Sequence, residues 1–203
     1  MFLAWLEEVG RKGDALHLVG DLIDFWFEWR HVVPKGSVRL LGKVAELVGG
    51  GPDGQWPLGI HDTWTRGYLS DELGVQVHAD PIEVLHAGQR YLVGHGDGLG
   101  PGDRKYKALK RLFRHPAARW AFARLHPDTA FGIGARMSRD SRAATAEAEA
   151  RFDGPEGEWL LHHCRAVLEQ EHYDGFIFGH RHLPLDLEVV PAAGPRPPPA
   201  RNS

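Results

Sequence analysis

The sequence contains a single cysteine, Cys164, so no disulfide can form within the chain, and this usage fits a reducing compartment. No apolar run approaches the roughly 18 residues that a membrane-spanning helix needs, and the first residues do not match a secretory signal peptide. A basic excess is also lacking, because 24 Lys and Arg residues stand against 27 Asp and Glu residues. These absences argue against a secreted disulfide scaffold, an integral membrane protein and a general nucleic-acid binder. We therefore expect a cytoplasmic protein.

The 203 residues can bury one sizeable core, and a single domain is expected over residues 1–190. Apolar residues at helical spacing predict helices over 1–12 and 38–48 and a mostly helical segment over 103–171. Short apolar runs predict strands over 15–19, 75–78, 82–86, 90–93, 173–178 and 185–190. Strands that alternate with helices indicate an α/β fold.

Two segments interrupt this pattern. The stretch 55–58 precedes a glycine where a strand is expected, but Pro57 makes it a poor strand because proline cannot donate a ladder hydrogen bond. Residues 191–203 are rich in Pro, Ala, Gly and Arg, which predicts a disordered tail.

What the sequence does contain is thirteen histidines, several of which stand beside aspartate and glycine in four short clusters. The clusters are GDLID at 20–24, GIHD at 59–62, GHGD at 94–97 and GHRH at 179–182. Each cluster alone is a weak signal, since a Gly-Asp pair is commonest in a turn and a lone histidine is usually structural. Together, on loops that follow apolar runs or glycine, they predict imidazole and carboxylate ligands for a divalent cation that activates water.

In this order, the clusters resemble the motifs of the calcineurin-like metallophosphoesterases. The nearer resemblance is to the branch of UDP-2,3-diacylglucosamine hydrolases, through LVGDLIDFWFEWR at 18–30 and HGDGLGPGD at 95–103 with Tyr106 and Lys107. The segments LHPD at 125–128 and SRDSR at 138–142 are also similar. The resemblance covers about residues 1–190. It implies a two-sheet α/β sandwich flanked by helices, with a helical lid over about 103–151.

Carried over residue by residue, the resemblance implies a metal site of four side chains. Asp21 would bridge two ions, His95 and His180 would bind one of them, and His182 would bind the other. The usual ion of the family is Mn²⁺, whereas the ligand types alone also permit Fe or Zn²⁺.

The resemblance further implies catalytic and substrate-binding residues. His61 would stabilise or protonate the leaving oxygen, and Asp62 would orient the ring of His61. Asp103, Ser141 and Arg142 would contact the substrate. On the residues alone, Asp103 could equally cap a helix, and Ser141 and Arg142 could lie on a helix surface.

The implied reaction is hydrolysis of the pyrophosphate of UDP-2,3-diacylglucosamine, a nucleotide-activated lipid, to UMP and the 1-phosphate lipid called lipid X. The segment 104–125 carries eight basic and no acidic residues with interleaved aromatic and aliphatic ones. This pattern fits the anionic inner face of a membrane, and hence a peripheral location there. A lid with a solvated basic face explains the pattern equally well. Neither a nucleic-acid partner nor an obligate protein partner is expected.

The sequence departs from the family pattern at three places. An Asp-x-His motif before the first helix and a closing C-terminal strand are both missing, and Ile60 stands where the family has a ligand asparagine. We therefore expect one ion or none, reduced activity, and a poorly soluble chain. Two alternatives stay open: a metallophosphoesterase that acts on nucleotides or phosphoproteins, and an inactive lipid-binding remnant.

Overall fold

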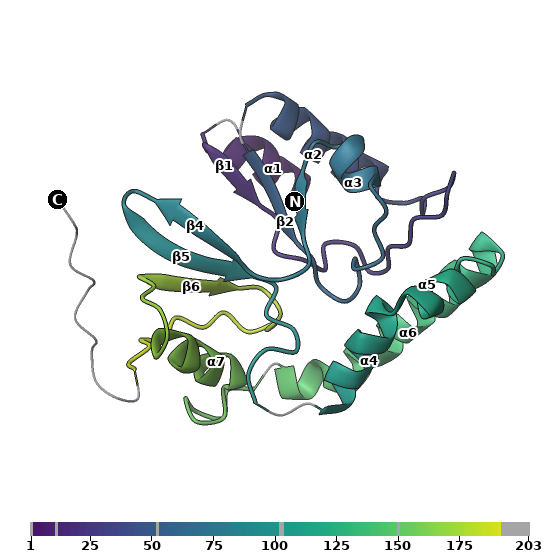
Figure 1. Ribbon diagram of the computed structural model, residues 1–203. Helices are drawn as coiled ribbons and strands as arrows, with labels where there is room; N and C mark the ends of the chain where they lie inside the picture. Colours follow the sequence, from purple (N-terminus) through teal and green to yellow (C-terminus); the bar gives the residue numbers. More distant parts are fainter. Residues whose placement is uncertain (1, 11, 52, 102–103, 150, 192–203) are drawn as a thin grey trace.

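The computed structural model describes residues 2–10, 12–51, 53–101, 104–149 and 151–191. Two three-stranded sheets lie at its centre, with helices on their outer sides (Figure 1). This mixed arrangement confirms the predicted α/β fold class. The predicted disordered tail lies outside the described residues from residue 192 onward.

The first sheet is parallel and has the strand order β1-β2-β3. Its strands are β1 (Ala15–His17), β2 (Asp53–Pro57) and β3 (Gln76–His78), and its helices are α1 (Phe2–Gly10), α2 (Val38–Gly49) and α3 (Tyr68–Asp71). Side chains from all these elements form the main apolar core, in which Leu6, Val44, Trp56 and Leu69 are fully buried. Apolar helix faces at the predicted spacing supply this core.

The expectation that residues 55–58 form a poor strand was wrong, since β2 is the central strand of this sheet. Pro57 is the last residue of β2, so its missing N–H removes no bond from the middle of the ladder. Trp56 beside it is fully buried, and Leu58 N–H donates to the His78 carbonyl at 2.8 Å. Pairing with strands on both sides and burial of the Trp56 indole therefore outweigh the weak local preference of this segment for a strand.

The second sheet brings two of the motif loops side by side. It contains β4 (Ile82–His86), β5 (Gln89–Gly94) and β6 (Gly175–Phe178), with β4 antiparallel and β6 parallel to β5. Gly94 pairs with Phe178 at the carboxyl end of both strands, so the loops that follow them start next to each other. The helix α7 (Trp159–Leu168) lies beneath β6 in Figure 1. The strand expected over 185–190 is absent from the structure, where these described residues are irregular.

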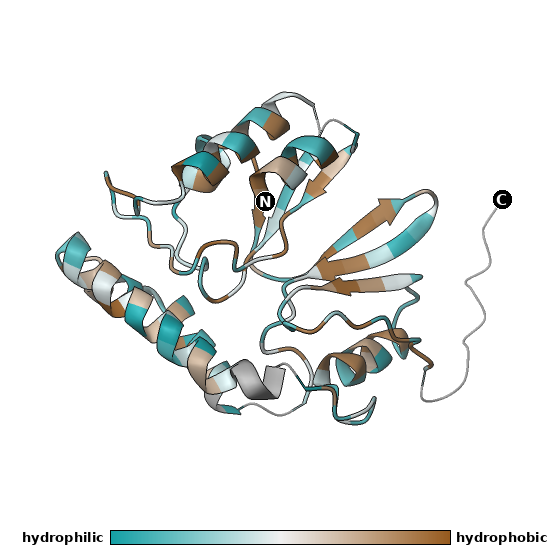
Figure 2. Ribbon diagram, turned by 180° about the vertical axis from the view of Figure 1, so that it is seen from behind, coloured by the Kyte–Doolittle hydropathy of each residue, from teal (hydrophilic) through white to brown (hydrophobic). Residues whose placement is uncertain are grey.

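Three further helices form an arm that extends away from both sheets (Figure 1). They are α4 (Arg104–Arg114), α5 (Pro116–Phe122) and α6 (Pro127–Glu149), and they occupy the segment predicted as a lid. Apolar and polar residues alternate along the arm in Figure 2. An aromatic cluster of Phe25, Phe27 and Trp64, joined by Phe113 and Phe122 from the arm, fixes the arm to the first sheet's loops.

Cys164 on α7 is buried, and burial raises the pKa of its thiol to about 12. The thiol therefore stays protonated and unreactive at neutral pH. Among the described residues, no helix is both long enough and apolar enough to cross a membrane.

Candidate metal centre

Asp21 lies on a tight turn a few residues after the end of β1. Both Gly20 and Asp21 have positive φ, 63° and 51°, a conformation that is costly for most residues and best tolerated by Gly, Asn and Asp. A Cβ on Gly20 would lie 2.6 Å from the Gly59 nitrogen and 2.8 Å from the His95 Nδ1. Glycine at position 20 therefore allows three motif loops to meet at one point.

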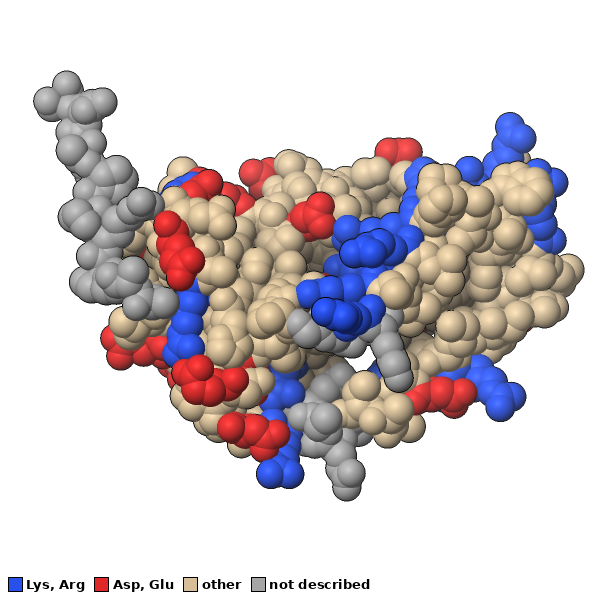
Figure 3. Space-filling model, turned by 60° about the horizontal axis from the view of Figure 1, so that its bottom comes forward, with Lys and Arg blue, Asp and Glu red and all other residues tan. Residues whose placement is uncertain are grey.

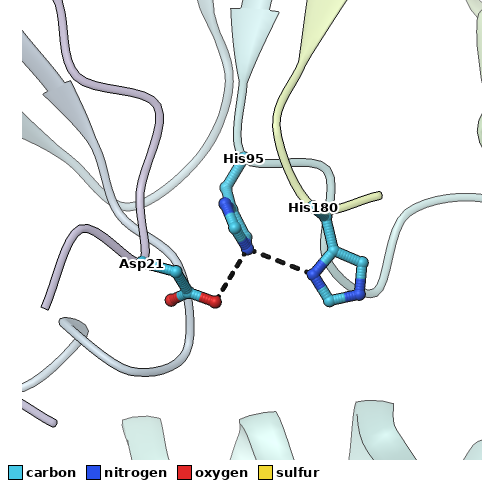
Figure 4. A group of neighbouring side chains, drawn as sticks. All are labelled: Asp21, His95 and His180. Carbon is cyan, nitrogen blue, oxygen red and sulfur yellow. Dashed lines mark hydrogen bonds and ion pairs between the residues drawn. The ribbon is translucent and has the colours of Figure 1, made fainter. Parts of the chain in front are cut away.

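His95 is the centre of the cluster. Its Nδ1 lies 3.0 Å from the Val19 carbonyl oxygen, which can only accept, so Nδ1 carries a proton and donates it there. Its Nε2 lies 3.0 Å from Asp21 Oδ2 and 3.1 Å from His180 Nδ1. Figure 4 shows the Nε2 atom between the other two side chains. A backbone carbonyl that holds one ring nitrogen while the other faces a common point is typical of metal-ligating histidines.

His180 reaches the cluster because its loop is bonded to the loop of His95. The backbone N–H groups of Gly179 and His180 both donate to the His95 carbonyl, at 3.1 and 2.8 Å. One ligand atom each from Asp21, His95 and His180 lie within 4.8 Å of one another, and among the described residues these three form the only such group. The structure therefore joins three of the four predicted metal ligands.

The electrostatics of the cluster fit a site for a cation. Burial would lower the pKa of His95, but the Asp21 carboxylate, which accepts its hydrogen bond, raises this pKa to about 9. Burial would also raise the pKa of Asp21, yet the hydrogen bond and charge of His95, together with His61, hold it below its ordinary value. Without a cation the pair is thus an imidazolium and a carboxylate. A divalent cation can replace the imidazolium proton against the same carboxylate.

His61 and Asp62 follow on the loop after β2. The His61 backbone N–H donates to Asp21 Oδ1 at 2.9 Å, and its side-chain Nε2 lies 3.8 Å from Asp21 Oδ2. Asp62 is fully buried and accepts hydrogen bonds from Trp56 Nε1 at 3.0 Å and from the Gly59 N–H at 2.7 Å. These bonds tie the Asp62 carboxylate to the start of the loop that carries His61.

Burial and, after it, the charge of Asp21 raise the pKa of Asp62 to about 7, although both hydrogen bonds oppose the shift. A carboxyl group with this pKa is about half protonated at pH 7, in contrast to Asp21, whose pKa is lowered. The two carboxyl groups therefore have different chemical characters: Asp21 is available as an anionic ligand, and Asp62 serves as a buried acceptor.

A cavity of about 360 Å³, here called the polar cavity, opens beside the cluster. Its lining includes the predicted site residues Asp21, His61, Ser141, Arg142, His180 and His182. Arg142 forms an ion pair with Asp24 at 2.8 Å, which connects α6 to the loop of Asp21. His182 lines the cavity without belonging to the three-residue group. Asp103 lies outside the described residues.

Two residues that sequence reasoning missed support the loop of His180 and His182. Glu158 is buried and accepts a hydrogen bond from Arg181 Nη2 at 2.8 Å, and the same nitrogen donates to the Arg151 carbonyl at 2.7 Å. Both side chains line the polar cavity. A separation of 23 positions gives no local signal, so only the fold could reveal this pair.

Two small sheets flanked by helices, with Asp21, His95 and His180 gathered on the loops at strand ends, define a metallophosphoesterase-type hydrolase. No family model matches the chain. Comparison with curated proteins finds the UDP-2,3-diacylglucosamine hydrolase of Porphyromonas gingivalis, 37% identical over 198 residues, which are 92% of this chain and 76% of that protein. The enzyme of the same name from Pseudomonas aeruginosa is 26% identical over 94% of this chain and 79% of its own length. The chain belongs to the UDP-2,3-diacylglucosamine hydrolase family.

Among solved structures, a protein of unknown function from Aquifex aeolicus is 19% identical with a TM-score of 0.32, and the match covers 55% of each chain.

Proposed function

We propose that the protein hydrolyses the pyrophosphate bond of UDP-2,3-diacylglucosamine and releases UMP and the 1-phosphate lipid, lipid X. Membership of a family whose curated members are named for this activity supports the proposal. The proposal rests on two neighbouring cavities, one lined by charged and polar residues and one lined mainly by apolar residues, that share part of their lining. Such a pair suits a substrate with a charged diphosphate at one end and acyl chains at the other.

The second cavity, here called the apolar cavity, has a volume of about 300 Å³ and lies between the arm and the first sheet's loops. Its wall is largely aromatic and aliphatic, and it includes Phe113, Phe122, Ile133 and Met137 from the arm. Four residues line both cavities: Ile60, His61, Tyr106 and Ser141. A lipid whose acyl chains fill the apolar cavity would therefore present its headgroup beside His61 and the Asp21 cluster.

For the metal, we propose that Asp21, His95 and His180 hold a divalent cation and that the ion is Mn²⁺. One carboxylate and two imidazoles suit a borderline divalent ion. When bound, such an ion polarises a phosphoryl oxygen and lowers the pKa of a water molecule. The Val19 carbonyl keeps the His95 Nε2 turned toward the site. His182, which lines the same cavity, is proposed as a ligand of a second ion.

We propose distinct roles for the residues around the scissile bond. His61 Nε2, held near Asp21 by the backbone bond of its own loop, donates a proton to the leaving oxygen. Arg142, which also lines the polar cavity, contacts the diphosphate in place of its present partner Asp24. Ser141 can donate a hydrogen bond from the boundary of the two cavities. Asp62 acts indirectly, through the loop that it holds.

We further propose that the arm meets the anionic inner face of a membrane, from which the lipid enters. Basic residues Arg104 and Arg111 lie exposed on α4, together with Leu109 and Leu112. The arm lies on the right in Figure 1, and Figure 3 shows dense groups of Lys and Arg in the middle and at the right-hand edge. Asp and Glu gather mainly on the left of that face. Exposed cations and apolar side chains on one helix favour an anionic lipid surface.

A turnover assay with a set of substrates tests the proposal. Purified protein with Mn²⁺ is expected to release UMP from UDP-2,3-diacylglucosamine and to be much slower on the acyl-free UDP-sugar, because that substrate leaves the apolar cavity empty. Equal rates on the acyl-free substrate, a nucleotide or a phosphopeptide would indicate a different phosphoesterase. Lipid binding without Mn²⁺-dependent UMP release would indicate an inactive lipid-binding protein.

A further inference from the structure

A third cavity is lined in part by Phe27 of the aromatic cluster and is here called the arginine pocket. It has a volume of about 870 Å³. Three arginines line it from two parts of the chain: Arg66 from the loop before α3, and Arg119 and Arg124 from α5 and the turn that follows it. Phe27 and Trp120 form apolar parts of the wall. The pocket shares no lining residue with the polar cavity.

No carboxylate lines the arginine pocket among the described residues. The Arg119 Nη2 donates to the Thr65 carbonyl, and the Arg124 guanidinium lies over the Trp120 ring, 4.7 Å from its centroid. None of the three arginines forms an ion pair with the residues that the structure describes, in contrast to Arg142 and Arg181. These contacts hold two of the guanidinium groups in place without neutralising their charge.

The acidic side chain whose charge acts on Arg119 is Glu28, which is buried. Its carboxylate oxygens already accept hydrogen bonds from Trp26 Nε1, Arg66 N–H and Tyr68 N–H. Burial, and after it the charge of Arg66, lower the pKa of Arg119 despite the opposing effect of Glu28. The positive charge of the pocket is therefore incompletely balanced, and a bound anion would relieve the repulsion between these two arginines.

We propose that the arginine pocket binds a phosphate group, as a phosphomonoester, a phosphodiester or free phosphate, at a site separate from the catalytic centre. Guanidinium groups offer paired N–H donors whose geometry matches phosphate oxygens. Trp120, whose side chain is 61% exposed, lies at the rim, where an indole can contact the apolar part of a phosphate-bearing molecule. The site lies on the arm, so the phosphate of an anionic lipid is one source and dissolved phosphate is the other.

Titration calorimetry with inorganic phosphate tests the site on the full chain. The double variant R66Q/R124Q changes two exposed arginines and leaves the half-buried Arg119 in place. The control is R136Q/R139Q, which removes the same charge from two exposed positions on α6. We expect R66Q/R124Q to weaken phosphate binding at least about tenfold and the control to change it less than about twofold. The variant R66K/R124K, which keeps the charge without the planar fork, should fall between them.

Cosedimentation then separates the two sources of phosphate. If the ligand is a lipid, vesicles with phosphatidylglycerol should bind the wild type and the control but release R66Q/R124Q, while phosphatidylcholine vesicles bind none of them. Phosphate binding without this vesicle difference would assign the pocket to a dissolved phosphate compound. Equal losses in R66Q/R124Q and the control, or no phosphate binding by the wild type, would overturn the proposal. UMP release by R66Q/R124Q from detergent-dispersed substrate should stay at the wild-type rate, whichever source is correct.

Discussion

Replacement of Glu28 should disturb both the stability of the protein and the position of its catalytic loop. The Glu28 side chain is only 2% exposed, and its carboxylate accepts three hydrogen bonds, from Trp26 Nε1 at 2.9 Å, Tyr68 N–H at 3.1 Å and the Arg66 N–H. Its own N–H donates to the Trp64 carbonyl at 3.0 Å. Glu28 thus joins the loop that follows Asp21 to the loop that carries His61.

The size of the effect follows from these contacts. Hydrogen bonds to a charged group contribute about 1.5–3 kcal/mol each. In Glu28→Gln the one remaining side-chain oxygen can accept from two of the three donors, whereas the new amide N–H₂ group must face the third donor. We therefore expect a loss of about 2–3 kcal/mol in the free energy of unfolding. For a domain of this size, that corresponds to a fall in Tm of roughly 4–12 °C. Glu28→Ala leaves three buried donors unpaired and should lose more.

Urea denaturation and thermal melting measure these changes. Glu8→Gln is the matched control, because Glu8 is exposed and its ion pair with the exposed Lys12, at 3.5 Å, is a surface contact. Since the Trp26 N–H donates to the His61 carbonyl at 2.8 Å, Glu28→Gln should also lower kcat for UMP release more than it changes KM. The argument is refuted if Glu28→Gln melts within about 1 °C of the wild type, or if it is no less stable than Glu28→Ala.

Three further predictions concern the metal centre and the base of the arm. His95 without metal has a pKa of about 9, so protons compete with Mn²⁺ for it below that pH. The Mn²⁺ affinity measured by dialysis should therefore rise up to about tenfold per pH unit below pH 9 and level off above it. An affinity independent of pH between 7 and 9 would contradict this prediction. Ile60→Asn places an amide oxygen beside the polar cavity and should strengthen Mn²⁺ binding and raise UMP release, whereas Ile60→Val should do neither. Lys110→Met removes the ion pair, at 2.9 Å, of the buried Asp97 and should lower the free energy of unfolding by about 3–5 kcal/mol in urea. The exposed pair of Lys12 with Glu8 is the control, and an equal loss in Lys12→Met would contradict the assignment.

The ligand cluster could be predicted from the sequence because each of its members lies on a loop that begins at the carboxyl end of a strand. His95 and His180 come next to the carboxyl ends of β5 and β6, and parallel pairing of those strands brings the two loops together. Asp21 lies on a Gly-Asp turn a few residues after β1, and this turn can be recognised in the sequence as a motif. Such local signals predict the site because the backbone of the strands and turns itself sets the positions of the ligand side chains.

Contacts that depend on distant burial could not be predicted. The sequence places Asp62 beside His61, but only the fold shows that its oxygens accept hydrogen bonds from the buried indole of Trp56 and from the Gly59 N–H. The same burial makes β2 a central strand in spite of Pro57. The arginine pocket could not be predicted from the sequence either, because Arg66 and Arg119 are 53 positions apart. Packing of the aromatic cluster brings the two segments together.

The central claim is that Asp21, His95 and His180 together bind a divalent cation. Equilibrium dialysis against Mn²⁺, with His95→Gln compared with the exposed control His126→Gln, tests it most directly. We expect the wild type and the control to bind Mn²⁺ alike and His95→Gln to bind at least about tenfold more weakly. Equal Mn²⁺ binding by all three proteins, or none by the wild type, would contradict the claim.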